Sequence, residues 1–308
     1  MLPLLIKRLK SPWILSLPHK TVEPKCKPHI TPIRAMVYST VRLFTTSSES
    51  KPLVILDVES DSGVAVVTLN RPEARNALNM SLANELCETF QSLAEKPNIT
   101  AVVLTGNGSA FCAGADLKER NGMTDEQWEA QHQSFQKAAL TFRDLPMPTI
   151  AAVNGPAFGG GLELVCLADW AFSAQEAKFG FPEVHLGIFP GMGATVTLPR
   201  LIHPSLARRL ILTGQTFTAL EGYRAGLFVQ LVNNDESVVD VAMKDAQRIS
   251  LNGPLAVRCA KKSIRECGEM LQFRQAWDHS LDLYATCFRS KERLEGIQAY
   301  NEKRRPNF

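Results

Sequence analysis

The amino-acid sequence predicts a mixed α/β fold with a helical C-terminal part. Short apolar runs rich in β-branched residues alternate with amphipathic helical segments up to about residue 235. Beyond that point the strand pattern stops, and four successive helical segments follow. The chain has 308 residues, 45% of them hydrophobic, which is enough for one large globular domain with an appendage. This order favours an α/β core followed by a helical region.

The predicted core begins with a β-hairpin. Residues 53–58 and 63–69 are β-branched, partly alternating runs that a turn of Ser, Asp and Gly separates. From Ser81, apolar side chains recur at spacings of four, four and three, which predicts an amphipathic helix that ends before Pro97. Residues 99–104 then predict a short buried strand.

Helix signals are clear after this strand. Thr124 and Gln127 are spaced as a capping box, so a helix is expected to start there and to run to about Asp144, before two prolines. Three further segments are predicted in chain order, namely a strand at 149–153, a helix at 162–168 and a strand at 170–174. The C-terminal helices are expected at 238–251, 254–267, 271–285 and 291–301.

The uncharged span 145–162 is long enough to suggest a membrane helix. It contains three prolines and four glycines, which a lipid-exposed helix would not carry, so no membrane span is expected.

The N-terminal segment differs in charge from the rest of the chain. Residues 1–48 hold eight basic residues against Glu23 alone, with Ser and Thr interleaved, which predicts a mitochondrial transit peptide cleaved near residue 44 and a location in the matrix. The alternative is a disordered basic arm of the kind that binds nucleic acid. The remaining chain holds 26 basic and 30 acidic residues, a net charge of −4, so it lacks a positive field for a polyanion.

The cysteine pattern argues against a disulfide framework and a zinc site. The seven cysteines are scattered, odd in number and without a C-x-x-C pair, so no metal is expected and the compartment is expected to be reducing. Cys112 lies in an apolar bend with no His nearby in the sequence, so its sulfur is expected to pack rather than to act as a nucleophile.

Two carboxylates in the middle of the chain are candidate acid/base groups. Glu163 follows the glycine run 159–161 and falls in the first turn of an otherwise apolar helix, where loss of water would raise its pKa. The alternatives are tight strand–helix packing for the glycines and dipole complementation for Glu163. Glu183 sits in a loop shaped by Pro and Gly, and taken alone it would more often be a solvated surface residue.

Backbone N–H groups are expected beside these carboxylates. The glycines at 159–161 would let a ligand approach the backbone, and the unpaired N–H groups at a helix start would stabilise an oxyanion. A second bend of small residues, 113–115, could expose another donor opposite the first. No G-x-G-x-x-G motif and no P-loop is complete, so a dinucleotide or phosphate cradle is not indicated.

Four segments together carry a family resemblance. They are Ala-Arg-Asn-Ala-Leu at 74–78, Phe-Cys-Ala-Gly-Ala-Asp-Leu-Lys at 111–118, the glycine-rich stretch 154–163 and the Phe-x-x-Pro-Glu stretch 179–191. In this order they resemble the signatures of the crotonase (enoyl-CoA hydratase/isomerase) superfamily, over about residues 53–308. The resemblance implies a spiral core of ββα units at 49–250, a C-terminal helical oligomerisation region at 251–308, and trimers or hexamers.

The resemblance also implies a role for each site residue. Glu163 and Glu183 align with the two acid/base glutamates of the hydratases, and the N–H groups of Ala115 and Gly160 align with the oxyanion hole. Contacts to coenzyme A are implied at Ala74, Ala113, Asp116, Leu117 and Lys118, and at Lys303 of a neighbouring subunit. The implied partner is an acyl-CoA substrate, and no separate cofactor is implied because coenzyme A is part of that substrate.

The implied reaction is syn addition of water across a 2-enoyl-CoA, which gives a 3-hydroxyacyl-CoA. Both glutamates would hold one water; one would remove its proton as it attacks C3, and a proton would be delivered to C2. Segments 111–120, 159–164, 293–296 and 302–304 look most like the 3-methylglutaconyl-CoA hydratase branch, which implies leucine breakdown, and short-chain hydration in β-oxidation is the other option.

Three alternatives to hydration stay open on the same residues. An enoyl-CoA isomerase needs one carboxylate, and another CoA-thioester lyase or decarboxylase can use the same fold. The non-enzymatic alternative is an RNA-binding protein, which the net charge of −4 outside residues 1–48 disfavours.

One segment departs from the family pattern. Members commonly read Gly-Gly-Thr-Gln-Arg-Leu after the Pro-Gly of the second glutamate loop, whereas this chain has Met-Gly-Ala-Thr-Val-Thr-Leu at 192–198. The missing Gln-Arg pair leaves open the packing under the site and the shape of the acyl pocket.

Overall fold

A computed structural model describes residues 51–308, apart from the side chains of residues 288 and 300. The transit peptide predicted at 1–48 lies outside the described residues. The main sheet has six strands in the order β1-β2-β3-β4-β6-β9, with β1 antiparallel to β2 and the other neighbours parallel. Its strands are β1 (Val54–Val58), β2 (Val64–Leu69), β3 (Ala101–Gly106), β4 (Thr149–Val153), β6 (Trp170–Ala174) and β9 (Gln230–Val232).

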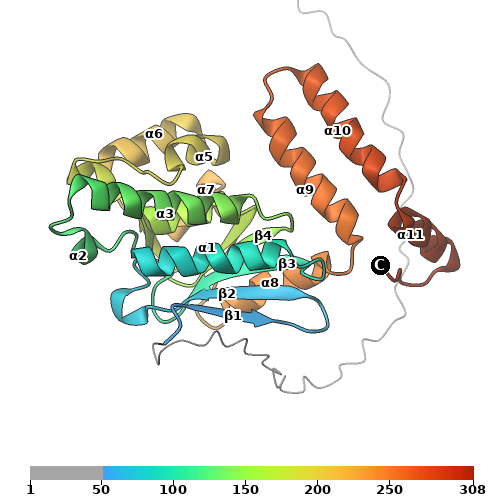
Figure 1. The fold of residues 1–308 in the computed structure, drawn as a ribbon, viewed down its shortest axis with the longest axis horizontal. Coiled ribbons are helices and arrows are strands. Elements are labelled where there is room, and N and C mark those ends of the chain that lie inside the picture. Colours follow the sequence, from blue (N-terminus) through green and yellow to red (C-terminus); the bar gives the residue numbers. More distant parts are fainter. Residues whose placement is uncertain (1–50) are drawn as a thin grey trace, which may run out of the picture. The chain divides into compact units, whose positions relative to one another are not determined.

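A second, three-stranded sheet has the order β5-β7-β8, and helices make up most of the remaining described chain (Figure 1). Its strands are β5 (Ala157–Phe158), β7 (Lys178–Gly180) and β8 (Phe217–Thr218). The helices are α1 (Met80–Ala94), α2 (Leu117–Arg120), α3 (Asp125–Arg143), α4 (Gly160–Leu167), α5 (Ala194–Leu201), α6 (Pro204–Thr213), α7 (Ala219–Ala225), α8 (Val238–Ile249), α9 (Pro254–Glu269), α10 (Phe273–Phe288) and α11 (Lys291–Glu302).

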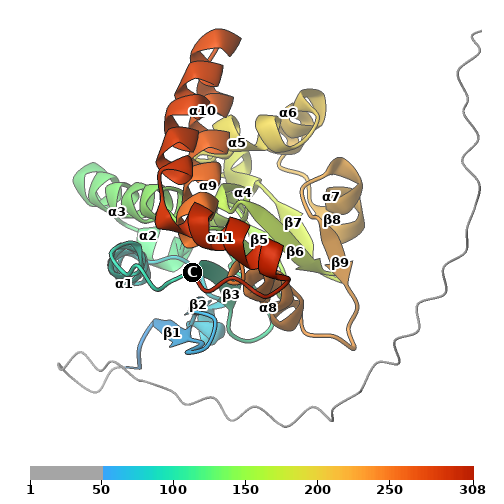
Figure 2. The ribbon, with the colours of Figure 1, turned by 90° about the vertical axis from the view of Figure 1, so that its right-hand side faces the viewer.

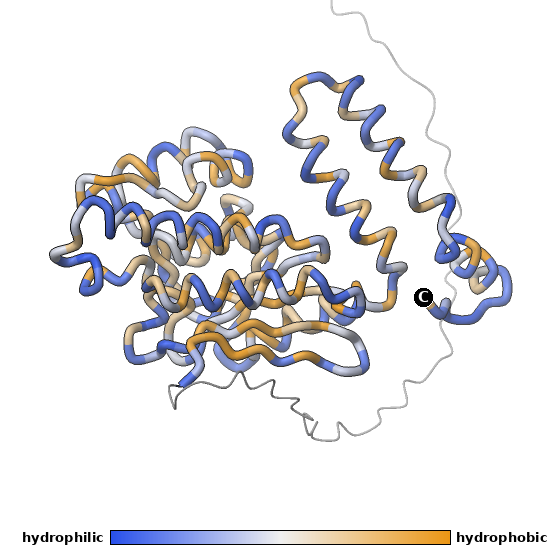
Figure 3. Tube along the Cα trace, viewed as in Figure 1, coloured by the Kyte–Doolittle hydropathy of each residue, from blue (hydrophilic) through white to orange (hydrophobic). Residues whose placement is uncertain are grey.

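The main sheet is buried on both faces because its side chains alternate between two cores. In β3, Val102 and Leu104 join the core that contains side chains of α1, α3 and α4. Ala101 and Val103 join a second core, together with side chains of α8. Figure 3 shows the result as strands that are hydrophobic along most of their length.

Local sequence signals set most element boundaries. Asn79 caps α1 by accepting a hydrogen bond from the Leu82 N–H at 2.9 Å. The helix begins at Met80, one residue before the start expected at Ser81. The capping box of Thr124 and Gln127 is present at the start of α3 as predicted. Strands β4 and β6 occupy the residues predicted for them.

Between residues 194 and 225 the structure adds elements that the sequence analysis did not predict. Helices α5, α6 and α7 and strand β8 are short, and Pro199 lies inside α5, where a proline usually indicates a helix end. The C-terminal helices lie where they were predicted, and none of the helices in residues 51–308 is long and apolar enough to cross a membrane.

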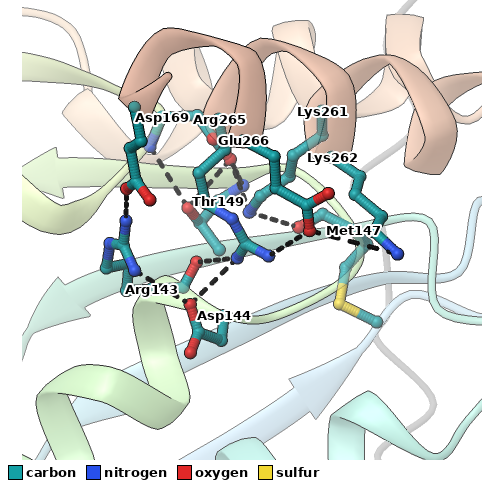
Figure 4. A network of polar contacts seen from close by, with 10 residues as sticks. Arg143, Asp144, Met147, Thr149, Asp169, Lys261, Lys262, Arg265 and Glu266 are labelled. Carbon is teal, nitrogen blue, oxygen red and sulfur yellow. Dashed lines mark hydrogen bonds and ion pairs between the residues drawn. The ribbon is translucent and has the colours of Figure 1, made fainter. Parts of the chain in front are cut away.

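Helices α9 and α10 run side by side (Figure 2). Polar contacts connect α9 to the core. The buried ammonium of Lys261 lies 2.8 Å from the carboxylate of Asp169 and donates to the Met147 carbonyl at 2.8 Å. One turn further on, Arg265 pairs with Asp144 at 2.9 Å (Figure 4). Burial lowers the pKa of Lys261, so only a well-placed anion keeps this ammonium charged inside the protein.

We expect Lys261→Met to weaken the attachment of α9. The substitution keeps the apolar stem but leaves Asp169 without its cation, which lowers the free energy of unfolding by about 1–3 kcal/mol. Urea unfolding followed by circular dichroism measures this change. Lys262→Met is the matched control, because that lysine is exposed and its carboxylate partner Glu266 is 4.0 Å away. Equal stability of the two variants would contradict a stabilising role for the buried pair.

Candidate active site

The first candidate carboxylate, Glu163, is held inside the protein by backbone donors. It projects from the first turn of α4 and is 2% exposed. Its Oε1 accepts hydrogen bonds from the N–H of Met192 at 2.8 Å and of Ala194 at 3.0 Å. Both donors come from the segment that lacks the Gln-Arg pair, so this segment can fix the carboxyl group through its backbone alone.

Burial changes the acidity of Glu163. Loss of water around the carboxyl group raises its pKa to about 7, and the nearby charge of Glu183 acts in the same direction. The N–H groups of Ala194 and Met192 favour the carboxylate and oppose this rise. A carboxyl group with this pKa can exchange a proton near neutral pH.

The second carboxylate, Glu183, lies beside the first and is also buried. It belongs to a short 3-10 helix, Pro182–Leu186, in the loop that was predicted from its Pro and Gly residues. Its Oε2 has no hydrogen-bond partner among the described residues. Burial raises the pKa of this carboxyl as well, while the positive charge of Arg120 opposes the rise. The structure therefore turns a residue that alone predicted a solvated loop into half of a carboxyl pair.

Gly159 makes the close approach of Glu183 possible. The glycine has φ +48°, and a methyl group on it would lie 2.8 Å from Oε1 of Glu183. A side chain at this position would therefore both strain the backbone and displace the carboxyl group.

The predicted N–H donors of Ala115 and Gly160 are both unpaired with respect to the described backbone acceptors. Leu78 donates to the Gly114 carbonyl at 2.7 Å and accepts from the Asp116 N–H at 2.8 Å, which leaves the N–H of the intervening Ala115 directed away from Leu78. Gly160 opens α4, where the first N–H groups lack intrahelical partners.

Glycines bring the two donor segments together. Gly114 has φ +89°, and a methyl group there would lie 2.8 Å from the Phe158 carbonyl oxygen and 3.6 Å from Cα of Gly159. A methyl group on Gly161 would lie 2.3 Å from the Cys112 carbonyl oxygen. Both segments therefore need glycine, and the packing explanation for the glycine run applies together with the functional one.

The residues implied for coenzyme A fall into two groups. Ala74, Ala113, Leu117 and Lys118 are close in the chain to the Leu78–Ala115 bridge, and the last three are exposed. Lys303 is exposed just after α11, and its assignment to the site of a neighbouring subunit stays a prediction.

Asp116 supports the site through contacts within the chain. Its carboxylate pairs with Arg71 at 3.1 Å and caps α2 by accepting the Lys118 N–H at 3.1 Å. These contacts lower the pKa of Asp116 against the opposing effect of partial burial. The side chain therefore orients the turn that presents the Ala115 N–H, and its implied contact with coenzyme A stays a prediction.

Sequence reasoning missed two sets of groups near the carboxylates. The N–H donors of Met192 and Ala194 come from the stretch 192–198, where the sequence indicated a departure from the family pattern but no backbone donors. Arg120 ends the recognised segment 111–120, but nothing in its local pattern indicated that its charge acts on Glu183.

Cys112 is a packing residue, as predicted. It is fully buried, and burial raises the pKa of its thiol to about 12. Among residues 51–308 no group of His, Cys, Asp and Glu side chains is arranged to hold a metal ion.

Residues 59–308 match the profile of the enoyl-CoA hydratase/isomerase family. The chain belongs to this family. The membership confirms the predicted crotonase superfamily, the predicted fold class and the predicted enzyme class, an enoyl-CoA hydratase.

Several relatives of this hydratase/isomerase chain are similar over most of their length. The crotonyl-CoA hydratase of Syntrophomonas wolfei is 36% identical over 252 residues, 82% of this chain and 96% of that protein. The 2,3-dehydroadipyl-CoA hydratase of Escherichia coli is 36% identical over 263 residues, 82% of this chain and 98% of that protein. The crystal structure of an enoyl-CoA hydratase from Bacillus anthracis superposes with a TM-score of 0.80 at 37% identity and covers 83% of this chain and 99% of that one.

We expect Gly159→Ala to abolish most activity by displacing Glu183. The methyl group would lie 2.8 Å from Oε1, so the carboxyl group must move, and loss of a positioned acid/base group costs roughly 100-fold or more in kcat. Gly226→Ala is the matched control, since that glycine has φ +89° but its nearest contact would be 3.8 Å away. Steady-state kinetics on crotonyl-CoA that show the same kcat for both variants would contradict this role of Gly159.

The raised pKa of Glu163 predicts a pH-dependent stability. Because the folded state holds this proton up to about pH 7 and the unfolded state only to about 4.5, stability is lost as the pH rises through that window. Glu163→Gln removes this titration but keeps an acceptor oxygen. Between pH 4.5 and pH 7 the unfolding free energy of the wild type should therefore fall relative to that of the variant by on the order of 3 kcal/mol.

Urea unfolding at the two ends of this pH window measures the difference. Glu176→Gln, at an exposed position, is the control and should follow the wild type at both values. A Glu163→Gln variant that also follows the wild type would show that Glu163 titrates at its ordinary pKa.

Proposed function

We propose that this protein hydrates 2-enoyl-CoA thioesters to 3-hydroxyacyl-CoA. The observation that carries the proposal is the pair of buried carboxyl groups, Glu163 and Glu183, together with the N–H groups of Ala115 and Gly160, which are unpaired among the described backbone groups. The names of the relatives, which include a crotonyl-CoA hydratase and a 2,3-dehydroadipyl-CoA hydratase, support the same reaction type.

The N–H pair acts on the thioester oxygen. As water attacks C3, negative charge develops on this oxygen, and the two backbone donors stabilise it without having to reorganise. The positive end of the α4 dipole acts in the same direction at Gly160. Removal of one such donor typically costs about 3 kcal/mol of transition-state stabilisation.

The carboxyl pair handles the water and its protons. With raised pKa values on both groups, the pair can hold a proton near neutral pH while it accepts another. One carboxylate removes a proton from the attacking water, and a proton is delivered to C2. Movement of a double bond needs only one carboxylate, so the presence of two favours hydration over isomerisation.

We further propose an acyl group of the 3-methylglutaconyl type and a role in leucine degradation. The support is the likeness of segments 111–120, 159–164, 293–296 and 302–304 to that branch of the superfamily. Short-chain enoyl-CoA hydration in β-oxidation is the competing assignment. The steps proposed above use the carboxyl groups, the N–H groups and the acyl-CoA substrate, with no separate cofactor.

A mitochondrial matrix location and a trimeric or hexameric assembly complete the proposal. The basic composition of residues 1–48 supports the location, and one relative is a mitochondrial enoyl-CoA hydratase of Pongo abelii, 34% identical over 87% of this chain and 91% of that protein. Helices α9 and α10 carry large exposed hydrophobic side chains, which supports association through this region. They include Ile264, Phe273, Trp277 and Leu281.

Glu163→Gln and Glu183→Gln are each expected to reduce crotonyl-CoA hydration by roughly 100- to 10,000-fold. Each variant keeps the shape of the side chain but removes one acid/base group. The decrease of enoyl absorbance in a steady-state assay measures the rate.

Glu176→Gln is the control and should retain wild-type activity, because Glu176 is exposed. Full activity in either the Glu163 or the Glu183 variant would refute its assignment as an acid/base group.

A further inference from the structure

Arg120 presents a guanidinium that the protein holds in one orientation. Its Nε donates to Oε1 of Gln131 at 2.8 Å, and Gln131 is itself fully buried and bonded to Glu119. The guanidinium carbon lies 4.1 Å from the ring centre of Trp128 and 5.5 Å from that of Phe135. Stacking and one hydrogen bond therefore fix the planar group before any ligand arrives.

The two terminal nitrogens of Arg120 have no acceptor in residues 51–308. No described carboxylate lies within ion-pair distance of them, whereas Arg71, at the start of the same site, is paired with Asp116. Arg120 is partly buried, so it has lost part of its hydration without gaining a paired anion. A cation in this position favours an anionic ligand group that can accept both terminal N–H groups.

Contacts of α3 place Arg120, the last residue of α2, near the carboxyl pair. His132 follows Gln131 on α3 and contacts Gly191, where a methyl group would lie 2.5 Å from its Cε1. Gly191 precedes Met192, whose N–H holds Glu163. The charge of Arg120 also acts on Glu183, although the two side chains form no ion pair. Because the glutamates act at C2 and C3, acyl atoms beyond C3 must lie past this pair.

We propose that Arg120 binds a carboxylate at the far end of the acyl group, so that the enzyme prefers acyl-CoA thioesters that carry a second carboxyl group. This inference rests on the proposed function and names the substrate class of the same site. A bidentate contact to the two terminal nitrogens gives both affinity and selection against acyl chains that end in a methyl group. The competing role of Arg120 is to tune Glu183 alone, and that role would affect every substrate equally.

The test compares binding of glutaryl-CoA and pentanoyl-CoA, which differ only in a terminal carboxylate against a methyl group and are not hydrated. Titration calorimetry on the full-length chain should show glutaryl-CoA binding about 10- to 100-fold more tightly, as a charge-assisted contact gives. Arg120→Met should remove most of this preference, and Arg120→Lys should keep part of it. Arg248→Met, at an exposed pair with Asp245 in α8, is the matched control and should keep the wild-type preference.

Two results would overturn the inference. One is equal affinity of the wild type for the two ligands, and the other is a preference that survives Arg120→Met. The second result includes an Arg120→Met variant that loses the same factor for both ligands, since the preference then survives and the loss fits a general effect on the site.

Hydration of glutaconyl-CoA and 2-pentenoyl-CoA, measured in parallel, tests the proposed function separately. If neither thioester is hydrated, the proposed hydratase function is refuted. The preference for glutaryl-CoA over pentanoyl-CoA still tests whether Arg120 binds a carboxylate. If both are hydrated and the preference is absent, the function stands and the inference fails.

Discussion

The hydrogen bonds from Met192 and Ala194 to the buried carboxyl group of Glu163 are the interaction on which the site depends. Two carboxyl groups side by side in an apolar interior repel each other when both are ionised, and burial penalises each charge. The two N–H donors offset part of that cost and fix one oxygen, while Oε2 of Glu183 has no hydrogen-bond partner within residues 51–308. The pair therefore has one anchored member and one member with a buried oxygen that no described residue contacts through a hydrogen bond.

Backbone contacts of glycine set the rest of the geometry. Gly114 and Gly161 allow the segment around Ala115 to lie against the start of α4, and Gly159 allows Glu183 to reach the same place. The sheet positions both segments, because α4 comes after β4 along the chain and the 111–115 bend comes after β3. The fold thus brings two unpaired donors and two carboxyl groups together from segments that are 20 or more positions apart in the sequence.

The sequence predicted the elements with strong local signals and missed those without them. The capping box of Thr124, the β-branched run of β4 and the helix breaks near the C-terminus each carry their own signal, and the structure agrees at these places. Helices α5 to α7 are short, and their positions depend on contacts with distant elements. Glu163 was predictable because its apolar neighbours indicated burial, whereas the burial of Glu183 depends on Gly159, and the role of Arg120 depends on Gln131 and Trp128 of another helix.

The protonation state of Glu163 in the folded protein tests the account most directly. Infrared difference spectra between the wild type and Glu163→Gln isolate the carbonyl stretch of this one protonated carboxyl group as the pH is raised. The account predicts that the band loses half its intensity near pH 7, because burial holds the proton there. Half-loss near pH 4.5, the ordinary value for a glutamate, would contradict the account, since the carboxyl group would then be hydrated and fully ionised at neutral pH.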